Sequence, residues 1–351
     1  MLDQVKQTKI VVIGGGTGTS AVLRGLKHHT SQLSAVVTMF DSGGSSGLLQ
    51  AEFGYPPLGD LRQCLLGLSE EVEANRSLRE LLDFRFHRES SLNGHSLGNL
   101  LLAALTTIGK DLELAIEEMS RLLRITGQVI PVALDRADLC AELQNGELIR
   151  GESNIDLRGQ RVPKIKRVFL DPPASANPKA LSAILDADVV VLGPGDLYTS
   201  IIPNLLVTGV LQTLAATQAT RIYVCNLMTK LGETDDFKAS EFVGEMIRYM
   251  GGPRLDWVMV NTQEVPAEVR GAYLAEGAVP VIPDLELVRK QVPGVLAARL
   301  SNNQIPLKHD QKRIAEAVAR IADMGRVQNT AAQNGTLAPA APIKHWPTVV
   351  S

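Results

Sequence analysis

The segment Gly14–Thr19 constrains the fold of this chain most strongly, because its four glycines and two threonines join a predicted strand to a predicted helix. The preceding run, Lys9–Ile13, is short and β-branched, as expected of a buried parallel strand. The following run, Thr17–His28, has the apolar spacing of an amphipathic helix. In a doubly wound α/β sheet, such a turn lies at the carboxyl ends of the strands, where ligands bind.

The composition of this turn favours an anionic ligand. Glycines let the main chain approach a phosphate closely, and the helix N-terminus adds unpaired N–H groups and partial positive charge. The match to the dinucleotide fingerprint is poor, because Thr19 stands at the third glycine position, and the turn lacks the lysine of a Walker A loop. A tight turn without a ligand is the alternative. The candidate ligand-binding residues here are Gly14, Gly15, Gly16, Thr17, Gly18 and Thr19.

Strand and helix patterns alternate along most of the chain and predict a Rossmann-like α/β three-layer sandwich with a mostly parallel sheet. The further strands predicted for the alternation are Leu33–Phe40, Val168–Leu170, Val189–Leu192, Ile222–Cys225 and Trp257–Val260. The further helices are Leu61–Ser69, Ser96–Ile108, Asp111–Arg124, Pro178–Asp186, Asn204–Ala216 and Ala239–Met250.

Short strands in the middle of the chain predict a small β insertion at about residues 128–165. They are Val129–Leu134, Ala141–Leu143 and Glu147–Gly151, and Asn145-Gly146 between the last two favours a tight hairpin turn. We expect one domain over residues 1–325 that contains this insertion. Residues 326–351, rich in Ala, Gln, Asn, Thr and Pro, are predicted to be a disordered tail.

The composition of the 351 residues argues against several classes of protein. The 35 Lys and Arg and 38 Asp and Glu residues give a net charge of −3, which is unlike a dedicated nucleic-acid binder. Cys64, Cys140 and Cys225 are too few and too scattered for a disulfide framework or a zinc ribbon. The N-terminus lacks the blocks of a signal peptide, and no apolar run approaches the roughly 20 residues of a membrane span. We therefore expect a soluble, cytoplasmic protein.

A second glycine-rich loop, Asp41–Gly47, follows the second predicted strand and should lie beside the first. Asp41 at the strand end has the chemistry to bind a ribose hydroxyl or a metal, and the glycines and serines after it can form an anion-binding concavity. A flexible surface loop is the alternative. The candidate binding residues are Asp41, Gly43, Gly44, Ser45 and Ser46.

Two predicted helix starts carry further polar groups. Asp60 is either an N-cap or a group that faces the same cleft as Arg62, whose guanidinium can bind phosphate or carboxylate. His95 can donate to a phosphate or act as acid or base, whereas Ser96 can simply cap its helix. Asn99, inside an apolar helix, needs a partner if it is buried.

A third turn, Leu192–Ser200, also follows a predicted buried strand. Its candidate binding residues are Gly193, Pro194, Gly195, Tyr198 and Thr199, with Ser200 as a third hydroxyl. The spacing of His, Cys and carboxylate residues predicts no metal site, and no G-x-S-x-G nucleophile elbow is present. The residues alone therefore predict a cleft that binds phosphate and has no evident nucleophile.

The motifs VVIGGGTGTS, FDSGGSSGLL, PPLGDLRQCLLGLS, NGHSLGNLLLAAL, IKRVFLDP and VVVLGPGDLYTSIIPNLL together resemble the YvcK proteins, or gluconeogenesis factors, of the CofD-like superfamily. The likeness runs in order from about Lys9 to about Asp323. It implies a Rossmann-like fold and a cleft for UDP-sugars such as UDP-N-acetylglucosamine. It also implies a role in cell shape and envelope synthesis during gluconeogenic growth.

The resemblance also implies roles for particular residues. Gly14–Thr19 should face the diphosphate, and Asn226 and Tyr273 should lie near the ligand. Lys308 stands where the family usually has arginine, so the charge is kept and the two-pronged contact is lost. Ser42 replaces the second acid of a loop that usually reads DDGGSSG, which weakens the case for metal-assisted transfer.

The function expected from these features is a UDP-sugar-binding regulator, not an enzyme, that acts through partner proteins. The alternative is a CofD-type transferase that moves a phospholactyl-like group from a nucleotide diphosphate donor to an alcohol, with Asp41 and Asp60 as its catalytic acids. A third reading, a nicotinamide-dependent dehydrogenase, requires a cleaner fingerprint in the first turn. The UDP-sugar-binding regulator requires no cofactor, although Mg²⁺ is compatible with it. Whether the protein forms a homo-oligomer is left open.

Overall fold

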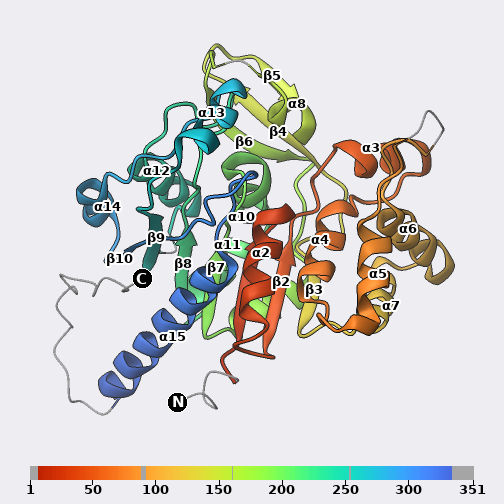
Figure 1. The fold of residues 1–351 in the computed structure, drawn as a ribbon, viewed down its shortest axis with the longest axis horizontal. Helices are drawn as coiled ribbons and strands as arrows, with labels where there is room; N and C mark the ends of the chain where they lie inside the picture. The colour runs from red at the N-terminus through yellow and green to blue at the C-terminus, as the bar shows by residue number, and fades with distance from the viewer. Residues whose placement is uncertain (1–6, 88–91, 160, 253, 334–351) are drawn as a thin grey trace.

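A computed structural model describes residues 7–87, 92–159, 161–252 and 254–333. A seven-stranded sheet, with the order β10-β9-β8-β7-β1-β2-β3, forms the centre of the molecule, and each neighbouring pair is parallel (Figure 1). Its strands are β1 (Ile10–Gly14), β2 (Leu33–Val37), β3 (Gln128–Pro131), β7 (Val189–Leu192), β8 (Thr220–Val224), β9 (Trp257–Asn261) and β10 (Gly294–Ala298). This architecture confirms the predicted α/β fold with a mostly parallel sheet.

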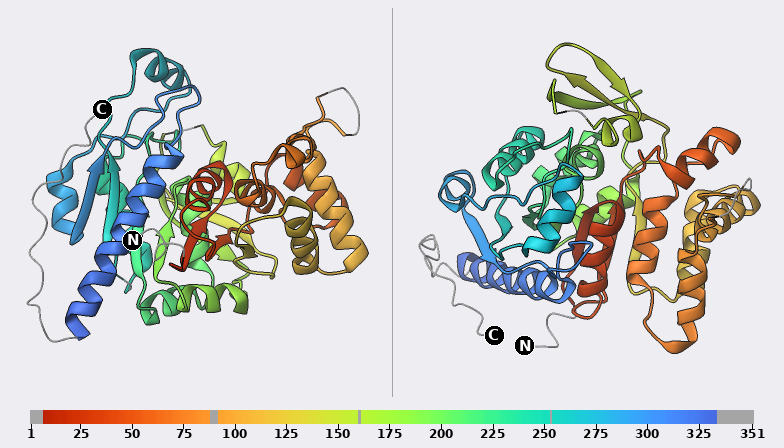
Figure 2. Two further views of the ribbon diagram at one scale, coloured as in Figure 1. Left: turned by 60° about the horizontal axis from the view of Figure 1, so that its bottom comes forward. Right: turned by 45° about the horizontal axis from the view of Figure 1, so that its top comes forward.

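Helices cover both faces of this sheet (Figure 2). The helices are α2 (Gly16–Leu26), α3 (Gly44–Phe53), α4 (Gly59–Leu68), α5 (Glu73–Asp83), α6 (Leu97–Gly109), α7 (Leu112–Leu123), α8 (Glu152–Asp156), α9 (Pro178–Leu185), η1 (Leu197–Ile201), α10 (Ile202–Leu206), α11 (Val210–Ala216), α12 (Ala239–Met250), α13 (Ala267–Ala275), α14 (Leu285–Gln291) and α15 (Gln311–Gln333). Helix α2 packs against α4 and α15, whereas α10 packs against α11 and α12.

The strand order reverses its direction between β1 and β7. The chain steps from β1 to β2 on one side and from β7 to β8, β9 and β10 on the other. Because crossovers between parallel strands are right-handed, the helices of the two halves lie on opposite faces of the sheet. The switch point of the sheet therefore lies at the carboxyl ends of β1 and β7, the place where open α/β sheets bind ligands.

The buried centre of the sheet explains the apolar strand patterns. Every residue of β1, β2 and β7 is buried, as expected of strands covered by helices on both faces. Side-chain caps fix three helix starts: Ser96 accepts from the Asn99 N–H at 3.1 Å, Asp111 from the Leu114 N–H at 2.9 Å, and Asn177 caps α9.

The insertion has different bounds from those predicted. Strand β3 (Gln128–Pro131) pairs with β2 and belongs to the main sheet. The insertion is a three-stranded antiparallel sheet of β4 (Asp138–Leu143), β5 (Leu148–Arg150) and β6 (Ile165–Asp171), in the order β5-β4-β6. The prediction placed β6 in the parallel alternation, because a short apolar run does not reveal which strand it pairs with.

Two helix predictions also need correction. The run Asn204–Ala216 forms α10 and α11, which are separated where Gly209 adopts a φ of 102° and Thr208 bridges to Ser175. The predicted tail from residue 326 begins inside α15, which continues to Gln333, because alanine, glutamine and arginine are good helix formers. The rest of that prediction, residues 334–351, lies outside the described residues.

None of the helices among the described residues combines the length and apolar character that crossing a membrane would require.

Candidate functional site

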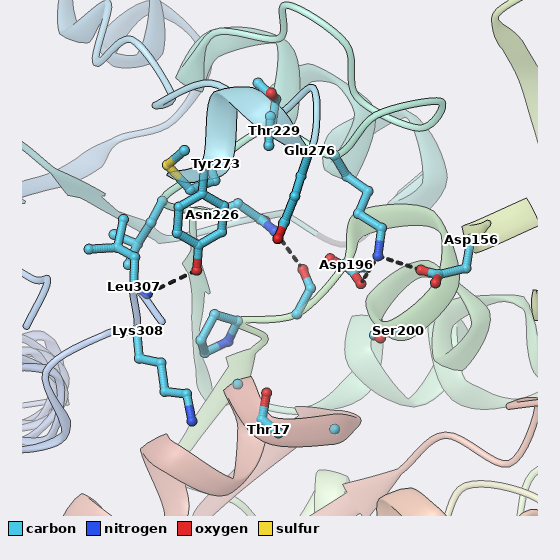
Figure 3. Close-up of a pocket in the computed structure, with 18 of the residues that line it drawn as sticks. Thr17, Asp156, Asp196, Ser200, Asn226, Thr229, Tyr273, Glu276, Leu307 and Lys308 are labelled. Carbon is cyan, nitrogen blue, oxygen red and sulfur yellow. Dashed lines mark hydrogen bonds and ion pairs between the residues drawn. The ribbon is translucent and has the colours of Figure 1, made fainter. Parts of the chain in front are cut away.

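A cavity of about 650 Å³ opens at the carboxyl ends of β1, β7 and β8, which we call the strand-end cavity. Its walls come from the turns that follow these strands, from α8 and the loop after it, from the end of α13, and from the Leu307–His309 segment (Figure 3). It therefore lies at the switch point between β1 and β7, where open α/β sheets bind ligands. A volume of this size suits a ligand of several linked rings or groups.

The turns after β1 and β7 pack directly against each other. A Cβ on Gly18 would lie 2.5 Å from the Pro194 carbonyl oxygen, so glycine permits this approach. A Cβ on Gly15 would lie 2.2 Å from Asp60 Oδ2, and Gly16 has a φ of +66°. The start of α2 thus brings its main chain to the cavity wall, and the N-terminus of a helix attracts anions.

Hydrogen bonds fix the opposite wall of the cavity. The Asn226 side-chain amide donates to the Gly195 carbonyl at 2.8 Å, and the Leu307 N–H donates to the Tyr273 hydroxyl at 2.9 Å (Figure 3). His309 Nε2 lies 3.2 Å from the Cys225 carbonyl oxygen, and burial lowers the pKa of His309 to about 4. The neutral imidazole therefore donates to that carbonyl at neutral pH.

Two lysines line the strand-end cavity. The Lys308 side chain is exposed and extends toward Thr17 (Figure 3). Lys230 Nζ lies 2.6 Å from Asp156 Oδ1 and 3.2 Å from Asp196 Oδ2. Burial by itself would lower the pKa of Lys230, but Asp196 and Asp156 outweigh burial and raise it, so Lys230 stays charged.

Glu233 lies behind Lys230 and is 5 % exposed. The Thr199 hydroxyl donates to Glu233 Oε1 at 3.2 Å, while Oε2 lacks a hydrogen-bond partner among the described residues. Burial and the neighbouring Asp196 carboxylate raise the pKa of Glu233 well above its usual value. One carboxylate oxygen from each of Asp156, Asp196 and Glu233 lies within 4.8 Å of the other two, although spacing along the chain predicted no metal site.

A second acidic cluster, formed by Asp41, Asp60 and Glu152, lies behind the Gly14–Thr19 turn. Burial and the Asp41 charge raise the pKa of Asp60 to about 7 and that of Glu152 to about 8. Asp41 accepts from the Gly43 N–H at 2.8 Å, and Glu152 accepts from the Ser42 N–H at 3.3 Å. Asp60 accepts from the Gly16 N–H, and Leu58, not Asp60, occupies the N-cap of α4, so the N-cap alternative is wrong.

Several predicted binding residues bond to protein groups instead of lining the strand-end cavity. Arg62 is 3 % exposed and donates to Asn99 at 3.0 Å and Asp83 at 2.7 Å. Ser45 Oγ lies 3.2 Å from His95 Nδ1. Ser96 caps α6, Ser46 accepts from the Gly59 N–H, and Gly43 and Gly44 form the start of α3.

The remaining predicted residues divide according to burial. The structure brings together nine of them around the strand-end cavity: Gly15, Gly16, Thr17, Gly18, Pro194, Gly195, Asn226, Tyr273 and Lys308. Thr19 is buried, and a Cβ on Gly14 would lie 2.4 Å from its hydroxyl. Gly193 is buried, and Tyr198 is 2 % exposed and packs edge-on against Tyr249.

Some cavity residues were not predicted from the sequence, among them Asp156, Asp196, Thr229, Lys230 and Glu276. Asp196 follows directly after the Gly-Pro-Gly turn, so its position at a strand end was an available signal. Asp156 comes from the insertion, and its place at the cavity depends on how that sheet folds back.

The family model of 2-phospho-L-lactate transferase CofD matches residues 10–301. The chain is 40 % identical over 313 residues to the gluconeogenesis factor of Bacillus subtilis, covering 88 % of this chain and 96 % of that protein. It is 40 % identical over 316 residues to the gluconeogenesis factor of Halalkalibacterium halodurans, covering 90 % and 96 %.

Two crystal structures of a Bacillus halodurans protein, one described as a member of the UPF0052 family, resemble this fold. Their TM-scores are 0.84 and 0.83, at 40 % identity, covering 89 % of this chain and 99 % of theirs. The chain belongs to the CofD family, in the group whose curated members are named gluconeogenesis factors.

Proposed function

We propose that this protein binds a nucleotide diphosphate sugar of the UDP-N-acetylglucosamine type in the strand-end cavity. The observation that carries this proposal is the placement of the Gly15–Gly18 backbone at the wall of a 650 Å³ cavity, at the switch point of the sheet. The helix N-terminus and the two lysines suit the diphosphate, and the side-chain amide of Asn226 and the hydroxyl groups of the wall suit the ribose and sugar.

The same proposal assigns a regulatory role to the bound state. The resemblance to YvcK proteins and the identity with gluconeogenesis factors support a protein required for cell shape and envelope synthesis during gluconeogenic growth. Ligand binding would then be read by partner proteins, and the protein would act in the cytoplasm. Burial lowers the pKa of the cavity histidine, His309, to about 4, far from the near-neutral value that suits a general base.

A CofD-type transferase is the second candidate, and the second acidic cluster favours it. The matching family model bears the name of a transferase, and Asp60 has a pKa of about 7, which suits general acid–base work at neutral pH. In that reading Asp41 and Asp60 would serve a phospholactyl-like transfer from a nucleotide donor to an alcohol.

Isothermal titration calorimetry of the full chain with UDP-N-acetylglucosamine, GDP and NAD, with and without Mg²⁺, separates the candidates. If the protein is a regulator, we expect it to bind the UDP-sugar preferentially, including in EDTA. Chromatography after overnight incubation should then show an unchanged ligand. Preference for GDP, strict dependence on Mg²⁺, or consumption of the ligand would contradict the regulator and favour the transferase.

A further inference from the structure

The strand-end cavity has an excess of negative charge for a site that takes an anion. Its described lining holds the carboxylates of Asp156, Asp196 and Glu276 against the ammonium groups of Lys230 and Lys308. Glu233 adds a further acidic group directly behind this wall. A diphosphate entering here would meet carboxylates as well as cations, and a bound divalent cation would remove that conflict.

We propose that Asp156, Asp196 and Glu233 form a binding site for a hard divalent cation such as Mg²⁺ or Mn²⁺ at the wall of the strand-end cavity. One oxygen from each carboxylate already lies within 4.8 Å of the others. Oxygen ligands about 2.0–2.6 Å from Mg²⁺ or Ca²⁺ are separated by at most about 4 to 5 Å, so small side-chain shifts complete the geometry.

The burial of Glu233 provides independent support for this site. The side chain is 5 % exposed, and its Oε2 has no hydrogen-bond partner among the described residues. A buried carboxylate oxygen without a partner is costly, and a metal ion is one of the few groups that satisfies it. Asp156, Asp196 and Glu233 come from α8, from the turn after β7 and from the loop after β8, so the tertiary fold assembles them.

In the absence of a cation, Lys230 neutralises part of the negative charge of this cluster of three acidic side chains. Its ammonium contacts Asp156 and Asp196, and an oxygen of the Glu233 carboxyl group lies within 4.8 Å of an oxygen of each of them. Because Lys230 also lines the cavity, its flexible side chain can turn to a phosphate when the cation takes its place. The cation and the anionic ligand would then bind cooperatively, and this coupling, unlike the site itself, rests on the proposed function.

The test is a titration of the full chain with Mn²⁺ in the absence of nucleotide, with binding detected by electron paramagnetic resonance. We expect one saturable site, weakened at least tenfold by Glu233→Gln and by Asp196→Asn. Lys230→Met should strengthen Mn²⁺ binding severalfold by removing the competing ammonium. Glu268→Gln is the matched control, because Glu268 is exposed on α13, outside both the cavity lining and the three-carboxylate cluster, and should leave the affinity within twofold.

Absence of saturable Mn²⁺ binding, or binding that Glu233→Gln leaves intact while Asp41→Asn abolishes it, would overturn the site. Thermal melts of each variant show whether a loss of binding reflects unfolding.

Titration with UDP-N-acetylglucosamine in EDTA tests the proposed function separately, because the backbone and lysine contacts do not need the metal. Mn²⁺ should then increase the affinity of the natural protein for UDP-N-acetylglucosamine about tenfold and leave the affinity of the Glu233→Gln variant unchanged. Equal tightening in both proteins would overturn the coupling.

Discussion

Asp60 lies so close to the backbone of Gly15 that a Cβ on Gly15 would come within 2.2 Å of Asp60 Oδ2. The Asp60 carboxylate also accepts the Gly16 N–H, one of the groups that the start of α2 would offer to an anion. The glycine turn and the acidic cluster behind it are therefore one structural unit, in which the carboxylate holds the shape of the turn and opposes negative charge in the cavity.

Gly15→Ala should disrupt this unit. The added methyl group would meet Asp60 Oδ2 and, at 2.5 Å, Thr38 Cγ2, so either the turn or the start of α4 must move. We expect a loss of about 1–3 kcal/mol in the free energy of unfolding and at least roughly tenfold weaker binding of UDP-N-acetylglucosamine. Urea unfolding and calorimetry measure the two effects.

Gly271→Ala is the control for this substitution. Gly271 lies within α13, and an added Cβ would meet nothing within 4 Å. Since alanine favours a helix over glycine by up to about 1 kcal/mol, this variant should be neutral or more stable. Equal losses in both variants would refute the argument from close packing.

Ligand affinity should fall as the pH rises from about 6 to 8. The pKa of Asp60 is about 7, so the group gains its negative charge across this range, next to the turn proposed to bind the diphosphate. We expect a decrease of roughly tenfold, or about 1.4 kcal/mol, and a flatter profile in Asp60→Asn. Calorimetry at several pH values checks this. A profile that Asp60→Asn leaves unchanged would assign the pH dependence to another group.

Lys308→Arg should strengthen ligand binding, and Lys308→Ala should weaken it. The exposed ammonium extends toward Thr17, where one charge is available to the diphosphate, and a guanidinium would add a second parallel hydrogen bond (Figure 3). We expect changes of about three- to tenfold in opposite directions by calorimetry. Lys312→Ala, on the exposed side of α15, should change the affinity less than twofold. Equal effects at both positions would indicate only a long-range charge effect.

His309 should make the fold sensitive to acid. Its pKa is lowered by burial from 6.5 to about 4, so between these values the unfolded chain binds a proton that the folded protein does not. Stability should therefore fall as the pH drops below 6.5, by about 1.4 kcal/mol per pH unit and about 3 kcal/mol in total. In urea unfolding at pH 7.5 to 4.5, His309→Gln should remove this part of the slope, because glutamine does not titrate. Its side-chain amide can still donate to the Cys225 carbonyl, so the hydrogen bond is kept. An identical slope in the variant would contradict the assignment.

The sequence predicted the sheet well, because buried parallel strands require continuous apolar runs and glycine turns at their ends. The run Val189–Leu192 is identical with β7, and Ala239–Met250 with α12. It also placed Gly15–Gly18, Pro194 and Gly195 at one edge of the sheet, where the structure has the strand-end cavity. Strand pairing was harder to predict. The prediction placed β3 in the insertion and β6 in the main sheet, whereas the structure has the reverse, because apolar runs do not specify their partners.

By itself, then, the sequence determined the α/β fold, its family resemblance and the glycine turns that face the cavity. Only the tertiary structure decided which polar residues reach that cavity. It buried Arg62 and Asn99 against each other and brought Lys230 to Asp156 and Asp196 from three separate segments. The physical reason is that local patterns fix which way a backbone runs, while the environment of a charged side chain depends on groups far away in the chain.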